Sequence, residues 1–370
     1  MAKKNKVVPG RVPFTWRKLV TAGVLAACAP AVAAYALQSG EPDRIEWSIS
    51  PNGSHMDSGK VQLTIESRWG ANSQSVWSND RPISDLQGLN PAQLNGSGGP
   101  VRFALIRDAG RLDCSGSAGH WRGHGACSFG ADPRFAAYLQ QHGISAPTPH
   151  DAFTLTMSGV GRDLVDAMQE IGYARPTAGQ LADMGIHGVS AEFVRGLARS
   201  DYRLQSADDL IDFKIHGVDL DYIRAMAAIG PKLQHLSADD LVSLRIHGVT
   251  PEYVRQIAAM SPQFSKLNAG DLVNFSIHGA RPELIRAYAA FTNGRLNPED
   301  IVSMAIHGVT GEYLQQLAAL GYGNLTADEL VSLRIHGVTP DYVRRLEQSG
   351  MKRMSADQLV DLRLRGFEPR

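Results

Sequence analysis

The chain has 370 residues, of which 43% are hydrophobic and 20% charged, and its 37 basic and 37 acidic side chains give a formal net charge of zero. This composition excludes a chain that is disordered throughout, and the length allows two domains or one domain with a repeat array. Residues 1–18 hold six Lys and Arg residues and no acid, which leaves 31 basic against 37 acidic side chains in the rest. An acidic body disfavours nucleic acid as a partner, because phosphate binding depends on neutralisation by Lys and Arg.

Residues 19–37, LVTAGVLAACAPAVAAYAL, follow this basic cytoplasmic segment and carry no charge. About 19 apolar residues approach the minimum for a membrane span, and basic residues before a span place the N-terminus in the cytoplasm. We therefore expect a single-pass inner-membrane anchor with the rest of the chain in the periplasm. Two alternatives remain: a signal peptide cleaved after Ala33 or Ala36, and lipidation at Cys28 within LAAC. All three alternatives export the rest of the chain.

Two cysteines, Cys114 and Cys127, lie in the exported part, within RLDCSGSAGHWRGHGACSF. Two cysteines in an oxidising compartment predict one disulfide bond, and two strands around a Gly-rich turn would bring them together. The alternative is a zinc or enzymatic site at the same hairpin, formed by Cys114, His120, His124 and Cys127 in the pattern C-x5-H-x3-H-x2-C. This spacing matches no common zinc module, so we predict the disulfide and no metal or other cofactor.

Residues 42–130 are predicted to form a small antiparallel β domain. RIEWSIS, GKVQLTIESRW, SQSVWS, VRFALIR and the cysteine hairpin are short runs rich in Val, Ile, Trp and Phe, separated by turn-forming residues. Residues 80–100 end in NGSGGP and are predicted to be a loop. Trp47, Trp69 and Trp77 are interpreted as core residues rather than as a ligand-stacking cluster, because a sandwich of this size needs bulky side chains in its core.

A repeat follows the last predicted strand, most plainly as LRIHGVTPEYVR at residues 244–255. The histidines of its IHG motif recur at spacings of 29, 31, 31, 29 and 29 residues, at His187, His216, His247, His278, His307 and His336. Each unit has two helical segments, so residues 132–370 are predicted to be an α-solenoid of helical pairs of 29–31 residues with atypical end copies. The expected fold class is α+β, with an N-terminal membrane helix, the β domain and then the solenoid.

Helix-capping residues predict where the helices of each unit begin and end. Ser237 with Asp240 is one of five capping boxes at the start of the first helix. Gly248 is predicted to take the left-handed conformation that ends this helix, which makes His247 and its five equivalents C-caps. A shared metal is excluded, because equivalent residues in stacked helical pairs lie about 10 Å apart, whereas zinc ligands lie about 2 Å from the ion.

A second row stands eight residues after the histidines: Arg195, Arg224, Arg255, Arg286 and Arg344, with Gln315 as the exception. An acid precedes each arginine by three residues: Glu192, Asp221, Glu252, Glu283 and Asp341. Ion pairs on a solvated helix face are one interpretation of this pattern. The other is a charged surface that receives a protein partner, as solenoids commonly offer.

The sequence contains no H-E-x-x-H, G-x-S-x-G or phosphate-loop motif, so no catalytic residue is predicted. LSADDLVSLRIHGVTPEYVR, together with VRFALIRDAGRLDCSG and GHGACSFGADPRFAAYL, resembles the extracytoplasmic C-terminal region of BlaR/MecR-type membrane metallopeptidases of Gram-negative bacteria. It also resembles stand-alone exported proteins with the same repeats. The resemblance covers residues 42–370, without that family's peptidase domain and zinc motif. It implies sensing or regulation through association with a peptidase.

These features favour an envelope protein that acts as an interaction scaffold or sensory module, with a protein partner in the periplasm or inner membrane. The less favoured alternative is a nucleic-acid-binding helix-hairpin-helix repeat. In that motif a G-h-G turn holds a phosphate, whereas Thr250 and its equivalents replace the second glycine here, and the exported part is acidic.

Overall fold

The computed structural model of the 370-residue chain describes residues 40–51, 59–70, 73–200, 202, 204 and 206–369. The predicted membrane segment, residues 19–37, and the basic segment before it lie outside these residues, so the anchor remains a prediction. Among the helices of the described ranges, none combines the length and the apolar character that a membrane span requires.

The chain divides into two compact units. The first contains the described residues as far as Gly161 together with Thr177–Ala182, and the second contains Arg162–Pro176 and the described residues from Asp183 onward. The predicted boundary at residue 132 marks the change from strands to helices. The first two helices after it, α3 (Pro133–Gln141) and α4 (Pro149–Ser158), belong to the same compact unit as the strands.

The strands of the first unit form one antiparallel seven-stranded sheet in the order β3-β2-β1-β7-β6-β5-β4. Their bounds are β1 Arg44–Ser50, β2 Lys60–Trp69, β3 Ser73–Pro82, β4 Leu86–Gln87, β5 Gly99–Arg107, β6 Gly110–Gly119 and β7 Arg122–Ala131. The five predicted strand segments correspond to β1, β2, β3, β5 and the β6–β7 hairpin. The predicted antiparallel β domain is therefore present.

The prediction of a loop over residues 80–100 is wrong. This segment contains the short helix η3 (Ile83–Asp85), strand β4 and helix α2 (Pro91–Asn95). Helix α2 forms because Asn90 and Gln93 make a reciprocal capping box and Pro91 occupies the first helical position. Local capping signals thus extend ordered structure into a stretch whose composition indicates a loop.

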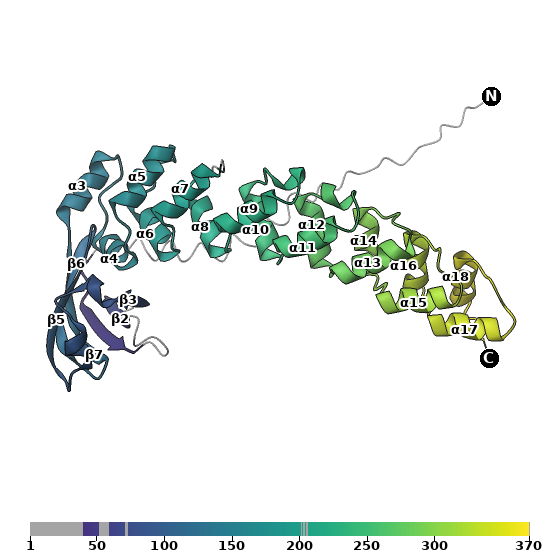
Figure 1. Ribbon diagram of the computed structural model, residues 1–370, viewed down its shortest axis with the longest axis horizontal. Helices are drawn as coiled ribbons and strands as arrows, with labels where there is room; N and C mark the ends of the chain where they lie inside the picture. Colours follow the sequence, from purple (N-terminus) through teal and green to yellow (C-terminus); the bar gives the residue numbers. More distant parts are fainter. Residues whose placement is uncertain are drawn as a thin grey trace, which may run out of the picture. The chain divides into compact units, whose positions relative to one another are not determined.

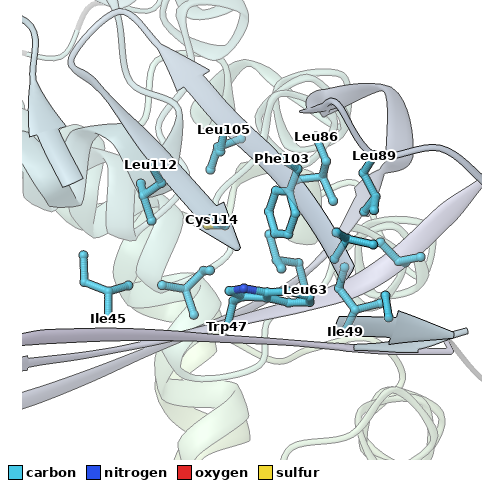
Figure 2. Packing of buried hydrophobic residues seen from close by; sticks show 14 of the residues in the cluster. Ile45, Trp47, Ile49, Leu63, Leu86, Leu89, Phe103, Leu105, Leu112 and Cys114 are labelled. Carbon is cyan, nitrogen blue, oxygen red and sulfur yellow. The ribbon is translucent and has the colours of Figure 1, made fainter. Parts of the chain in front are cut away.

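The sheet curls over its own apolar face, so one sheet rather than the two of a sandwich encloses the core. Trp47 on β1 and Phe103 on β5 lie three places apart in the strand order, yet their ring centroids are 4.9 Å apart. Figure 2 shows the Phe103 ring standing edge-on to the Trp47 indole among aliphatic side chains. Trp47 and Trp69 are buried, and Trp77 is partly buried against the same cluster, which agrees with the core interpretation of all three.

Helix α4 packs on β6 and β7 of the sheet. Its Phe153 makes edge-to-face contacts with Trp69 and Phe129, at ring centroid distances of 5.4 and 5.3 Å. His150, one turn earlier, lies 4.8 Å from the Trp69 ring, and burial lowers the pKa of its imidazole. These contacts explain why a helix at the predicted start of the repeats belongs to the sheet unit.

The repeat helices alternate along the chain (Figure 1). The first helices of the pairs are α6 Ala178–Ile186, α8 Ala207–Ile215, α10 Ala238–Ile246, α12 Ala269–Ile277, α14 Pro298–Ile306, α16 Ala327–Ile335 and α18 Ala356–Leu364. The second helices are α7 Ala191–Arg199, α9 Leu220–Ala227, α11 Pro251–Ala258, α13 Pro282–Phe291, α15 Gly311–Ala319 and α17 Pro340–Gln348, and α5 Arg162–Ile171 precedes them. Short helices η4 (Pro231–Leu233) and η5 (Phe264–Lys266) occupy the two longer connections.

Two rows of helices result from this alternation. From α8 to α18 each first helix contacts the next first helix, and from α7 to α17 each second helix contacts the next second helix. The predicted helical-pair array is therefore present. Each pair exposes one face of its first helix and one face of its second, and the same positions recur on these faces from pair to pair.

Candidate interaction surface

The histidines of the IHG motif stand where the first helices end. His216, His247, His278, His307 and His336 are C-caps, and His187 directly follows the last residue of α6. Gly248 has φ +71°, its N–H donates to the Arg245 carbonyl, and the Val249 N–H donates to the Leu244 carbonyl at 2.9 Å. This is the Schellman arrangement, in which a left-handed glycine satisfies the last carbonyls of a helix.

The imidazole adds a bond to some of these helix ends. Nδ1 of His247 donates to the Ser243 carbonyl at 2.7 Å, and Nδ1 of His336 donates to the Ser332 carbonyl at 2.8 Å. Within the residues described by the structure, no group of three or more His, Cys, Asp or Glu side chains is placed to hold a metal ion. The geometry of the histidines is therefore that of helix ends.

A tyrosine row, which the sequence did not predict, ties successive repeats together from α9 to the C-terminal end of the array. The Tyr222, Tyr253, Tyr313 and Tyr342 hydroxyls donate to the carbonyls of Val249, Ala280, Val338 and Phe367, at 2.8–2.9 Å. Each acceptor is the residue after the left-handed glycine of the following repeat. In α13 a leucine takes the usual tyrosine position, and Tyr288, four residues later, bonds to the Val309 carbonyl at 2.7 Å. Burial raises the pKa of Tyr222 and of Tyr313 to about 12.

Cations of the first helices lie over aromatic rings of the preceding second helix. Arg245 and Arg334 stand 4.7 Å from the ring centroids of Tyr222 and Tyr313. Arg363 over Tyr342 and Lys214 over Phe193 repeat this contact at 5.0 Å. Such cation–π pairs join neighbouring repeats. They also direct these cations toward the interior of the array.

The predicted arginine row lies on the second helices. Only some of its arginines pair with the acid three residues earlier. Arg224, Arg255 and Arg344 pair with Asp221, Glu252 and Asp341, as the spacing suggests. Arg195 instead pairs with Asp163 at 2.7 Å and Glu170 at 3.0 Å, both on α5. Arg286 is exposed, and no ion pair with Glu283 is seen in this described part of the chain. Exposed ion pairs of this kind contribute little to stability.

The first helices expose an isoleucine at one repeated position. Among the described residues, seven of the nine exposed large hydrophobic side chains occupy it: Ile186, Ile215, Ile246, Ile277, Ile306, Ile335 and Leu364. The six isoleucines are 41–56% exposed. Each is the last residue of its helix. We call these seven residues the aliphatic row.

The neighbours of each isoleucine on its helix extend the apolar surface. Val242 lies four residues before Ile246 and is half-buried, and Asp239 lies seven residues before it and is exposed. Residues spaced in this way share one helix face. The same order of acid, half-buried valine and exposed isoleucine or leucine recurs on α14, α16 and α18.

A hollow of about 270 Å³ lies between α12 and α14 on this face. Phe275 of α12 and Pro298, Val302 and Ile306 of α14 supply its apolar walls. Asp271 and Glu299 lie at the N-terminal ends of the two helices, and His307 lies at the C-terminal end of α14. The aliphatic row therefore includes a depression large enough for a side chain of a partner.

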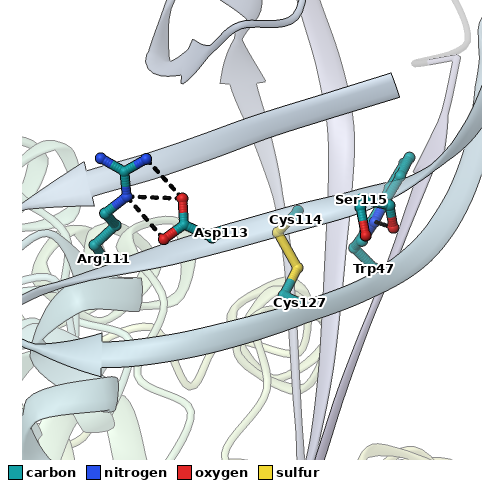
Figure 3. Close-up of a disulfide and its surroundings, with 6 residues drawn as sticks. All are labelled: Trp47, Arg111, Asp113, Cys114, Ser115 and Cys127. Carbon is teal, nitrogen blue, oxygen red and sulfur yellow. Dashed lines mark hydrogen bonds and ion pairs between the residues drawn. A yellow bond between two sulfur atoms is a disulfide. The ribbon is translucent and has the colours of Figure 1, made fainter. Parts of the chain in front are cut away.

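The cysteine hairpin has the geometry of a disulfide. Cys114 and Cys127 are directly opposite each other on β6 and β7, with the sulfur atoms 1.97 Å apart (Figure 3). Alternation along β7 places His124 on the opposite sheet face from Cys127. His120 lies in the hairpin turn, where it and Trp121 have positive φ. The four residues of the alternative zinc pattern are thus not gathered around one point.

The hairpin turn and its glycines differ from the sequence expectation. The turn residues are His120 and Trp121 rather than glycine, and their N–H groups donate to the carbonyls of Gly96 and Leu94. The glycines on β6 and β7 instead leave room for the side chain of Trp47. A side chain at Gly123 or Gly125 would collide with its indole, whose Nε1 donates to the Ser115 carbonyl at 3.1 Å.

Comparison of this chain with protein-family models, with curated proteins and with solved structures gave no match. The resemblance to the extracytoplasmic region of BlaR/MecR-type peptidases therefore stays an inference from the motifs quoted above.

Proposed function

We propose that this chain is a protein-binding scaffold of the bacterial envelope that holds its partner on the aliphatic row of the repeat unit. The same proposal includes anchoring through residues 19–37, export of the rest of the chain, and regulation by association with a peptidase. The disulfide supports the export part of it, because disulfides persist in oxidising compartments.

The aliphatic row is the observation that carries this proposal. Scattered apolar side chains on a protein surface need no explanation, whereas apolar side chains gathered on one face indicate an interaction site. The fold does not require isoleucine where about half of the side chain stays in water, since exposed positions contribute little burial. Repetition of the same side chain on successive helices offers an extended surface, which is how solenoids bind their partners.

The surface chemistry argues against the two alternative functions. Asp239, Glu299 and Asp328 are exposed on the same helix face as the isoleucines and would repel a phosphate backbone. At the hairpin, a cysteine that binds a metal or acts as a nucleophile must be a free thiolate, and the sulfurs of Cys114 and Cys127 are bonded to each other.

Site-specific photo-crosslinking in the native cell tests the proposal. A photoreactive amino acid placed at Ile277 or Ile306 samples the aliphatic row, and the same amino acid at Arg255 or Arg286 samples the exposed second helices as a matched control. The proposal expects a discrete protein adduct from the row positions and none from the controls, at equal expression. Absence of an adduct at every row position, or the same adducts at the controls, would contradict it.

A further inference from the structure

We infer that the aliphatic row binds an amphipathic α-helix that lies across the first helices, with one apolar side chain about every seven residues and basic side chains along one flank. This inference rests on the proposed function and names the partner of the same surface.

The spacing of the row favours a helix over an extended segment. Packed helices lie about 8–10 Å apart, so exposed isoleucines of successive first helices repeat at about that distance. Seven residues of an α-helix rise about 10.5 Å and return to nearly the same face. In an extended strand, side chains on one face repeat about every 6.6–6.8 Å, which is about 3 Å short of a spacing of about 10 Å, whereas the heptad rise matches that spacing to about 0.5 Å. A helix with heptad spacing therefore places one apolar side chain at each repeat.

The hollow between α12 and α14 gives this helix an anchor. Its walls are apolar at Phe275, Val302 and Ile306, and Ile306 leaves about half of its side chain in water (53% exposed). Phe275 is already buried in the array, so a leucine or phenylalanine of the partner would bury the exposed surface of Ile306 and the half-buried Val302. Side chains that fill such pockets near the middle of an interface carry a large share of the binding free energy.

The charges beside the row specify the basic flank. Asp239, Glu299 and Asp328 are exposed at the N-terminal ends of α10, α14 and α16, on the face of the isoleucines. The cations of the same helices do not face these acids, because Arg245 and Arg334 lie near the opposite helix ends and over tyrosine rings. One edge of the row is thus negative, and a partner with Lys or Arg along the matching flank meets complementary charge.

Peptide binding to the full-length chain, kept in detergent, tests the inference by fluorescence anisotropy. The probe is a helical peptide of about four heptads with leucine at every seventh position and lysine on one flank. A second peptide has the same composition with leucine at every fifth position, and a third has glutamate in place of lysine. Full-length Ile277→Ser/Ile306→Ser is the test variant, and Arg255→Gln/Arg286→Gln on the second helices is its matched control.

The inference expects the lysine-flanked heptad peptide to bind the wild-type chain and the control variant equally. Binding to the Ile277→Ser/Ile306→Ser chain should weaken at least about tenfold at an unchanged unfolding midpoint, and both altered peptides should weaken by a similar factor. Failure of the heptad peptide to bind, equal binding of all three peptides, or no effect of the row variant would overturn it.

The two proposals fail separately in these experiments. A cellular adduct at the row without binding of the heptad peptide would support the scaffold function and contradict the helical partner. Concentration-dependent self-association of the full-length chain that the row variant abolishes, without peptide binding, would show that a second copy occupies the row and would also overturn the helical partner. Absence of both the cellular adduct and the peptide binding would contradict the scaffold function as well.

Discussion

The Trp47 indole packs against β6 and β7 at positions where only a glycine leaves room for it. A Cβ added at Gly125 would overlap the Ser115 carbonyl oxygen and stand 2.5 Å from the indole Nε1 of Trp47. Gly130, five residues along the same strand, has no atom within 4 Å of such a Cβ. Gly125 therefore has no room for a side chain, whereas Gly130 does. The residues around the two glycines in the sequence do not reveal this difference.

Alanine substitution should separate these two glycines. Gly125→Ala is expected to destabilise the sheet unit by about 3 kcal/mol, at the upper end of the usual overpacking range, because Trp47 and β6 must move. Gly130→Ala should change stability by less than about 0.5 kcal/mol. Urea unfolding followed by tryptophan fluorescence measures both. Equal effects would show that the indole does not occupy this space.

The tyrosine row predicts a loss of stability at alkaline pH. Burial raises the pKa of Tyr222 and of Tyr313 to about 12 in the folded chain, against about 10 when unfolded. The folded state holds its phenol protons more tightly, so this stabilisation is complete below pH 10 and is lost as the pH rises from 10 to 12. Each tyrosine accounts for at most about 1.4 kcal/mol per pH unit.

Urea midpoints of the helical signal at about pH 8 and about pH 11 measure this loss. The Tyr222→Phe/Tyr313→Phe chain serves as the comparison, since it lacks two of the phenols, and its midpoint should fall less between the two pH values. An equal fall in both chains would contradict the assignment of the alkaline loss to these residues.

The exposure of the isoleucine in each IHG motif was not predicted from the sequence, although the sequence holds a signal for it. Leu241 and Leu244 are buried in α10, and Ile246 lies about 140–200° around the helix from them. An apolar residue at that angle cannot share their core.

At the scale of the helix, capping signals are local and therefore readable. The five predicted capping boxes all occur, as do the side-chain caps at Ser190, Asp219, Thr250, Thr310 and Thr339. Contacts between helices are not local. The pairing of Arg195 with Asp163 and Glu170 on α5, in place of the i−3 glutamate, could not be read from the spacing of charges on α7.

Gly248 and His247, at the end of α10, should contribute unequally to the free energy of unfolding. Gly248→Ala is expected to cost about 1–2 kcal/mol, because a Cβ is strained at φ +71° even though no atom stands within 4 Å of it. His247→Ala loses one bond from an imidazole to the Ser243 carbonyl and should cost less than about 1 kcal/mol. Chemical denaturation of the two variants gives both values. A larger cost for the histidine would reverse this account of the helix end.

At the scale of the molecule, the order of a β domain and a helical array is apparent from sequence periodicity, whereas the closure of the sheet is not. Trp47 and Phe103 meet only because the sheet curls, and alternation within single strands carries no information on curvature. The assignment of α4 to the sheet unit depends on contacts of Phe153 with Trp69 and Phe129, which join segments more than twenty residues apart.

The division into two compact units predicts a local effect of the disulfide. Cys114→Ser/Cys127→Ser should lower the stability of the sheet unit by about 2–4 kcal/mol. Trp47, Trp69, Trp77 and Trp121 all lie in that unit, so their fluorescence reports it, whereas helical circular dichroism reports mainly the repeats. The fluorescence transition should move to lower urea and the helical transition should stay. A common shift of both would show that the two units unfold as one.

Coverage of the aliphatic row in the living cell shows most directly whether a partner occupies it. Ile277→Cys and Ile306→Cys each introduce a thiol on the row, and Arg286→Cys introduces one on the second helices. Their rates of reaction with a membrane-impermeant maleimide are compared between intact cells and the purified full-length chain, by mass spectrometry of the labelled peptides. We predict that the two row thiols react at least about tenfold more slowly in the cell, at about 1.4 kcal/mol for each factor of ten, while the control thiol reacts at the same rate in both. Equal rates at the row positions in the cell and in the purified chain would contradict it.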